Sequence, residues 1–206
     1  MVTVWGRITS INVRKVVFTL QELGVVFERI NAGSEYGIVK TPGYLAKNPN
    51  ALVPLLEDGE VRLWESNVIV RYLCARHSAG ELYPLQLAQR FDAERWMDWQ
   101  QTTLNPAARN AFIQWIRTPA EKRDLQLVTQ SVTATEALMA MLDEHLSRQP
   151  FMAGDRLTMA DIPIACELHR WQGLPQARPE RKHLQRWYDG MLARPAARGV
   201  LDMALT

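Results

Sequence analysis

The stretch from Asn50 to Asn67 combines groups that could bind a small acidic peptide. Ser66 follows a strand-like run and is a good N-cap for a helix, and the free amides at a helix start attract carboxylates. Upstream, the bond between Val53 and Pro54 is of the X-Pro kind, which adopts the cis form at low cost. A cis bond would turn the main-chain N–H and C=O of Val53 outward, free to pair with an extended ligand. These residues therefore predict a peptide site made of a backbone edge and a helix start.

The elements around this stretch predict a small mixed sheet. Apolar alternation over residues 2–5 indicates a strand, helical spacing of apolar residues over 13–23 indicates a helix, and residues 25–30 indicate a second strand. Asp58-Gly59 lies between two strand-like runs, which is typical of a hairpin, and a helix follows that hairpin. This β-α-β and then β-β-α order indicates a sheet with helices packed against it.

From Gln86 onward the pattern is helical only. A long helix is predicted to bend at Pro106, because proline cannot donate the backbone hydrogen bond of a helix interior. Thr118 begins a capping box that predicts the next helix. Thr158 and Asp161 form a second box, which we interpret as structural, since the loss of such a cap costs about 0.5–2 kcal/mol of stability.

Composition excludes several classes of function. The chain has 206 residues, a net charge of +2 and 47% hydrophobic residues, so it can form a sizeable core and lacks the charge of a nucleic-acid or membrane-surface protein. No apolar run approaches the ~20 residues of a membrane helix, and no signal peptide is evident. Cys74 and Cys166 lie in apolar runs without metal-type spacing. We therefore expect a cytoplasmic protein without a bound metal.

Several blocks of the sequence together resemble the glutathione S-transferase superfamily, most closely its bacterial B type with a Ser/Asn loop, which is similar to the theta and nu types. The blocks span nearly the whole chain: Trp5-Gly6-Arg7, Ser10-Ile-Asn12-Val-Arg-Lys15, Asn48-Pro-Asn50, Trp64-Glu-Ser-Asn-Val-Ile-Val-Arg-Tyr72 and Gly154-Asp-Arg-Leu-Thr-Met-Ala-Asp161. The resemblance implies an α/β thioredoxin-like domain over residues 1–78, a linker over 79–86 and an all-α helical domain over 87–206. It also implies a homodimer, with glutathione as the co-substrate.

In such an enzyme the nucleophile is the glutathione thiolate, so the site must favour the anion of a thiol whose ordinary pKa is roughly 8.5. A shift of about 2 units requires about 2.7 kcal/mol, which one or two hydrogen bonds to sulfur can supply. The resemblance places the donor in the loop after the first strand, at Ser10 or Asn12. Family members with tyrosine or cysteine carry it where this chain has Arg7, Ile8 or Ser10. The alternative is that Ser10 or Asn12 only caps the following helix.

The resemblance also assigns the residues that hold glutathione. The backbone of Val53 would pair with the cysteinyl residue, and Asn12 lies beside the same group. Glu65 would bind the γ-glutamyl ammonium, and Ser66 with its amide the γ-glutamyl carboxylate. Lys40 is a candidate for the glycyl carboxylate, although a surface lysine is the more common explanation for a residue of this kind.

The electrophile is expected between the two domains, against Arg7, Arg109 and Trp115. Two arginines suit a small carboxylate-bearing electrophile such as a halogenated acid, because guanidinium pairs well with carboxylate. One alternative is a glutathione-dependent disulfide reductase or isomerase. The other is a non-catalytic binding or regulatory protein, since this fold serves several functions.

Overall fold

The computed structural model describes residues 1–206 and begins with the predicted mixed sheet. Its strands are β1 (Val2–Trp5), β2 (Phe27–Ile30), β3 (Leu55–Asp58) and β4 (Val61–Trp64), in the spatial order β2-β1-β3-β4. β1 pairs in parallel with β2 and antiparallel with β3, and β3 pairs antiparallel with β4. The Asp58-Gly59 hairpin prediction is confirmed, and Gly59 adopts the left-handed φ of 59° that glycine accepts without steric cost.

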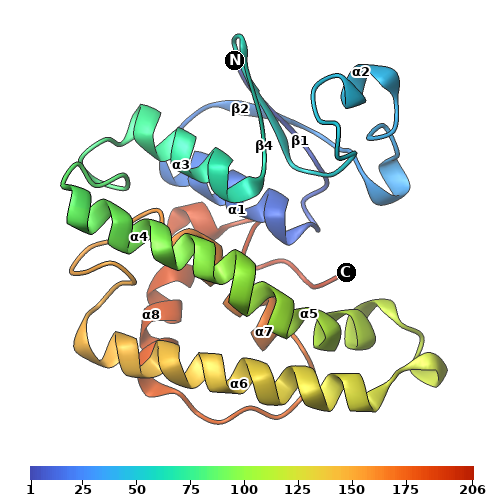
Figure 1. The fold of residues 1–206 in the computed structure, drawn as a ribbon, viewed down its shortest axis with the longest axis vertical. Coiled ribbons are helices and arrows are strands. Elements are labelled where there is room, and N and C mark those ends of the chain that lie inside the picture. The colour runs from blue at the N-terminus through green and yellow to red at the C-terminus, as the bar shows by residue number, and fades with distance from the viewer.

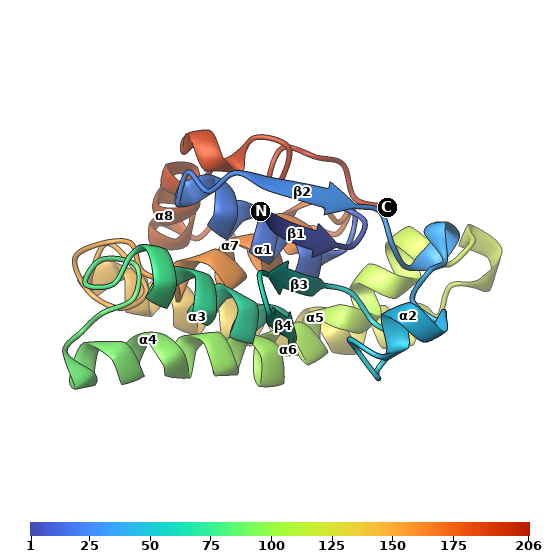
Figure 2. The same cartoon turned by 90° about the horizontal axis from the view of Figure 1, so that it is seen from above.

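Helices α1 (Ile11–Glu22) and α3 (Ser66–His77) lie on one face of the sheet, and α2 (Pro42–Leu45) lies beyond the ends of its strands (Figures 1 and 2). Thr41 caps α2 with its side chain, as the Thr-Pro pair predicts. Ser66 was predicted to be the N-cap of α3, but it is the first helical residue, and Glu65 occupies the cap position with a φ of 71°. The helix start thus lies one residue earlier than predicted.

The rest of the chain is helical, as predicted. Its helices are α4 (Leu87–Trp99), α5 (Asn105–Phe112), α6 (Leu125–Arg148), α7 (Asp161–Gln172) and α8 (Lys182–Leu192). None of the helices is long and apolar enough to cross a membrane.

A π-helical turn at Gln100–Leu104 separates α4 from α5, and a second one at Ile113–Arg117 ends the helix after α5. The first one ends just before Pro106, where the missing N–H breaks the regular hydrogen-bond ladder, so the predicted irregularity is present. The prediction that a helix begins at Thr118 was wrong, because that segment forms only a 3₁₀ turn at Ala120–Lys122. Asp124 caps α6 instead, and its carboxylate accepts from the amides of Gln126 and Leu127.

A single hydrophobic core of 41 buried residues runs through both halves of the molecule. α1 is its centre, because Val13, Val16 and Phe18 are fully buried between the sheet and α7. At the start of α7, Asp161 is also fully buried, and its carboxylate accepts from the main-chain amides of Met152 and Thr158, each at 2.9 Å. The second capping box is therefore structural, as predicted.

Candidate active site

The loop between β1 and α1 starts at Gly6, which lies close to two valines. A Cβ on Gly6 would come within 2.4 Å of a methyl group of Val13 and 3.3 Å of Val53, and its φ is 155°. Only glycine lets the loop pass this closely. The close approach places the loop that carries Arg7, Ser10 and Asn12 against the Val53 segment.

Ser10 and Asn12 both face a cavity instead of capping α1. Ser10 occupies the N-cap position, but its side chain makes no capping hydrogen bond. The carboxamide oxygen of Asn12 accepts from the Ser66 hydroxyl at 3.3 Å, which leaves the Asn12 NH₂ group free to donate. Simple helix capping therefore does not account for either side chain, and both can donate to an anion in the cavity.

The backbone at Val53 is available to a ligand. The Val53–Pro54 bond is cis, as predicted. Main-chain groups elsewhere in the protein do not bond the N–H or C=O of Val53. The carbonyl of Leu52, just before Val53, accepts from the Tyr44 hydroxyl at 2.6 Å and from the Asn48 side-chain NH₂ at 2.9 Å. These two bonds hold the open edge in place.

The remaining predicted glutathione contacts lie outside this cavity. Ser66 is 3% exposed and joins the site through Asn12, whereas Glu65 is exposed beside it at the start of α3. Lys40 is exposed on the loop before α2 and has no ion-pair partner. The structure thus places Glu65 and Ser66 together and leaves Lys40 on the surface.

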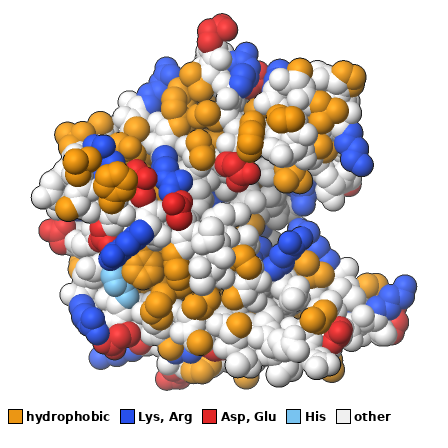
Figure 3. All heavy atoms as spheres, viewed as in Figure 1, with side chains coloured by type: hydrophobic (Ala, Val, Ile, Leu, Met, Phe, Trp, Pro, Cys, Tyr) orange, Lys and Arg blue, Asp and Glu red, His pale blue; other side chains and the backbone are white.

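The cavity lies between the two domains and has a volume of about 410 Å³. A hollow opens between the sheet side and the helical side of the molecule, with basic side chains at its inner end (Figure 3). The predicted residues Arg7, Ser10, Asn12, Val53 and Arg109 all line the cavity. Its other walls come from α5, α7 and the C-terminal segment, and include Phe112, Ile113, Cys166, Leu205 and Thr206.

No aspartate or glutamate lines this cavity. Five arginines do: Arg7, Arg14, Arg109, Arg117 and Arg170. Burial lowers the pKa of Arg117, and the positive charges of Arg7, Arg170 and Arg109 lower it further. Burial also lowers the pKa of Arg14, which donates to the carbonyls of Ile8 and Ala204, each at 3.0 Å. The cavity is therefore strongly positive and suited to an anion.

Trp115 does not line the cavity, in contrast to the prediction. Its indole ring lies under the guanidinium of Arg123, whose central carbon is 5.2 Å from the ring centroid. Six residues after Arg109, Trp115 lies roughly 120° away around a helix of 3.6 residues per turn, and the π-helical turn does not bring it back to the cavity face.

Sequence reasoning missed Arg14, Arg117 and Arg170. Arg117 is eight residues after Arg109, a spacing that could have suggested a shared helix face. Arg170 lies on α7, and its pairing with the site depends on the packing of distant segments. That packing leaves no signal in the local sequence.

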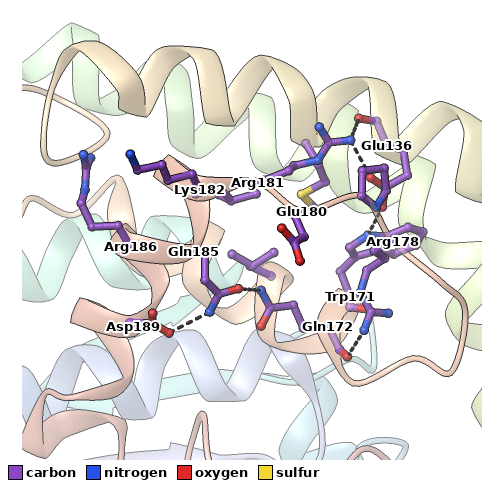
Figure 4. Close-up of a pocket in the computed structure, with 14 residues that line it drawn as sticks. Glu136, Trp171, Gln172, Arg178, Glu180, Arg181, Lys182, Gln185, Arg186 and Asp189 are labelled. Atoms are coloured by element: carbon purple, nitrogen blue, oxygen red, sulfur yellow. Dashed lines mark hydrogen bonds and ion pairs between the residues drawn. The ribbon is translucent and has the colours of Figure 1, made fainter.

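A larger cavity of about 1070 Å³ lies elsewhere, between α6, α7 and α8 (Figure 4). Its lining mixes acidic and basic side chains, and Glu136 pairs with Arg181 at 2.7 Å. Trp171 donates to the same Glu136 at 2.8 Å. None of the predicted site residues lines this cavity, so the interdomain cavity is the candidate active site.

Comparison with known proteins agrees with this geometry. The family model described as "Glutathione S-transferase, N-terminal domain" matches residues 1–75, and the one described as "Glutathione S-transferase, C-terminal domain" matches residues 104–195. Over 203 residues the chain is 43% identical to "Glutathione S-transferase GstB" of Escherichia coli (strain K12), covering 98% of each. The chain belongs to the glutathione S-transferase family.

Two further comparisons place the chain within this family. The solved theta class glutathione S-transferase of Xanthomonas axonopodis pv. citri, with glutathione bound, superposes with a TM-score of 0.96. It is 41% identical to this chain, and the match covers 100% of this chain and 99% of that one. "Glutathione S-transferase 4" of Zea mays is 29% identical, covering 97% of this chain and 91% of the relative. The thioredoxin-like and helical domains are those of a glutathione S-transferase, and the chain is an enzyme of this family.

Proposed function

We propose that the protein conjugates the glutathione thiolate to a small acidic electrophile, such as a halogenated acid. The observation that carries this proposal is the cavity lined by five arginines and by no aspartate or glutamate, bordered by Ser10 and Asn12. The glutathione bound to the Xanthomonas relative supports the same co-substrate here.

Glutathione would lie along the backbone at Val53, whose free N–H and C=O pair with the cysteinyl residue. Its γ-glutamyl carboxylate would lie at the start of α3, where Ser66 and the unpaired amides of the first helical turn attract an anion. Glu65 would receive the ammonium, and Lys40 the glycyl carboxylate. This pose directs the thiol toward Ser10 and Asn12.

In the reaction, Ser10 or Asn12 donates a hydrogen bond to the sulfur, and the thiol proton leaves to solvent. The thiolate attacks the carbon that bears the halogen, so that the carbon–sulfur bond forms as the carbon–halogen bond breaks and halide departs. Arg7, Arg109 and Arg117 hold the carboxylate of the electrophile and orient that carbon.

Three broader proposals concern the domains, the assembly and the partners of the protein. The domains divide at residues 79–86, with glutathione binding in residues 1–78 and part of the electrophile site in 87–206. The enzyme is a cytoplasmic homodimer, as the family resemblance implies. It uses no metal, nucleic acid or membrane.

The test compares two electrophiles of similar shape, bromoacetate and its neutral analogue bromoacetamide. We expect the enzymatic rate, divided by the uncatalysed rate, to favour the acid, and Arg109→Ala to reduce that preference about tenfold. Hydrogen bonds to charged groups contribute about 1.5–3 kcal/mol, and the exposure of Arg109 places it at the lower end.

Arg95→Ala is the matched control, because Arg95 lies on α4 in a surface pair with Asp92, outside the cavity. Equal acceleration of acid and amide, unaltered by Arg109→Ala, would contradict the acidic electrophile. Binding of glutathione without conjugation of any electrophile would contradict the transferase reaction.

A further inference from the structure

Lys15, in the middle of α1, is a buried cation close to the candidate site. Its side chain is 0% exposed, and its ammonium donates to three carboxamide oxygens. These belong to Gln100 at 2.8 Å, Gln101 at 3.1 Å and Asn67 at 3.3 Å. All three donor positions of the ammonium are thus used, and none of them goes directly to a carboxylate.

Burying an ammonium is costly, so this arrangement needs a reason. The pKa of Lys15 is lowered to about 8, chiefly by burial and to a smaller extent by the positive charge of Arg170. Glu167, Cys166 and Glu65 act in the opposite direction. The three carboxamide oxygens offset part of this cost, because each accepts from the ammonium.

One side of the Lys15 network reaches the proposed glutathione site. Asn67 is the second residue of α3, next to Ser66. Its oxygen accepts from Lys15, and its NH₂ group donates to the carbonyl of Met97 on α4 at 2.7 Å. Both ends of the Asn67 carboxamide are therefore fixed, and the start of α3 is held against the helical domain.

The other side reaches the electrophile cavity. The Gln100 carboxamide donates to Glu167 at 2.9 Å, and Glu167 is paired with Arg170. Arg170 lines the cavity, donates to Asn105 at 2.7 Å and lies over the ring of Phe112. Gln100 and Gln101 are adjacent in the π-helical turn, and both reach the same ammonium.

We propose that Lys15 is a positioning residue of the transferase, which joins the start of α3 to Arg170 through Asn67 on one side and through Gln100 and Glu167 on the other. This inference rests on the proposed function, because it assigns glutathione to the start of α3 and the acidic electrophile to the cavity that Arg170 lines. Lys15 itself touches neither substrate. Its ammonium also adds positive charge behind the amides that receive the γ-glutamyl carboxylate.

The experiment separates the two sides of the network with two variants. Lys15→Met removes the ammonium and keeps the length of the side chain. Gln100→Leu cuts the link to Glu167 and leaves the contact between Lys15 and Asn67. Lys47→Met is the control, since Lys47 forms a partly exposed pair with Glu57 in the same domain.

Two readouts are used: the Kd of S-methylglutathione, whose sulfur cannot ionise, and the KM for bromoacetate at saturating glutathione. For Lys15→Met we expect both to rise about tenfold, the size of one lost charged hydrogen bond. For Gln100→Leu only the KM rises, and for Lys47→Met neither changes.

An unchanged Kd and KM in folded Lys15→Met, with only a lower unfolding temperature, would overturn the inference and leave a purely structural lysine. If Lys15→Met does not fold, an unchanged KM in Gln100→Leu overturns it. Wild-type protein that fails to bind S-methylglutathione would instead overturn the proposed function, and this inference with it.

Discussion

The ionisation of bound glutathione is the most direct test of the site, because Ser10 and Asn12 offer different donors to the same sulfur. The Ser10 hydroxyl makes no capping bond, and the Asn12 carboxamide is oriented by the Ser66 hydroxyl at 3.3 Å. This contact occupies the oxygen of Asn12 and directs its NH₂ group away from Ser66. We therefore expect Asn12→Ala to remove an oriented donor and Ser10→Ala to remove one that rotates freely.

The magnitude follows from the number of donors and their surroundings. A hydrogen bond to a charged group contributes about 1.5–3 kcal/mol, and one pKa unit corresponds to about 1.4 kcal/mol. Both side chains are only partly buried at the edge of an open cavity, so the lower end applies. Each donor should thus lower the thiol pKa by about one unit, and the double variant should return it to roughly 8.5.

The assay is a titration of enzyme-bound glutathione by the ultraviolet absorbance of its thiolate. Circular dichroism confirms that each variant is folded, and Thr9→Val tests the other hydroxyl of this loop, because Thr9 also lines the cavity but is not assigned as a donor. We expect no change in the titration for Thr9→Val. Identical titration curves for the wild type, Ser10→Ala, Asn12→Ala and the double variant would refute the assignment of the donor.

Two further predictions concern stability. Asp161→Ala should reduce the free energy of unfolding by about 3 kcal/mol or more, since it leaves the buried amides of Met152 and Thr158 and the Trp187 indole without an acceptor. Urea unfolding measures this loss, and a value below about 1 kcal/mol would contradict the prediction. The pKa of Lys15 is about 8 in the folded protein and 10.5 in the unfolded chain, so between these pH values the unfolded chain binds more protons. The free energy of unfolding of the wild type should therefore rise with pH across this range, by about 3 kcal/mol relative to Lys15→Met. If the free energies of unfolding of the two proteins changed in parallel with pH, burial would not lower the pKa of Lys15, and the prediction would be wrong.

Much of the fold was predictable because local rules and tertiary packing agree. The hairpin at Asp58-Gly59, the cap at Thr41 and the box at Asp161 each depend on a few neighbouring residues, and all three are present. Thr118 was misleading for the opposite reason. Its segment has a capping signature, but Arg123 donates to the carbonyls of Gln114 and Thr118 and holds it as a compact turn.

The site was predictable in its N-terminal half and less so in its helical half. Arg7, Ser10, Asn12 and Val53 lie together because a short loop and one hairpin place them, and the family blocks identify those segments. The helical wall depends on the phase of a long helix, and a π-helical turn changes that phase without any marker residue. Of the two residues predicted for this wall, Arg109 lines the cavity and Trp115 does not.

The uninterrupted apolar interior has a consequence for how such an enzyme can change. Separating the halves at the connecting segment would expose the inner surface of α1 to water, so neither half is an interchangeable module. New substrate preferences should therefore arise by replacing residues of the cavity wall such as Arg109 and Arg117, which lie outside the hydrophobic core.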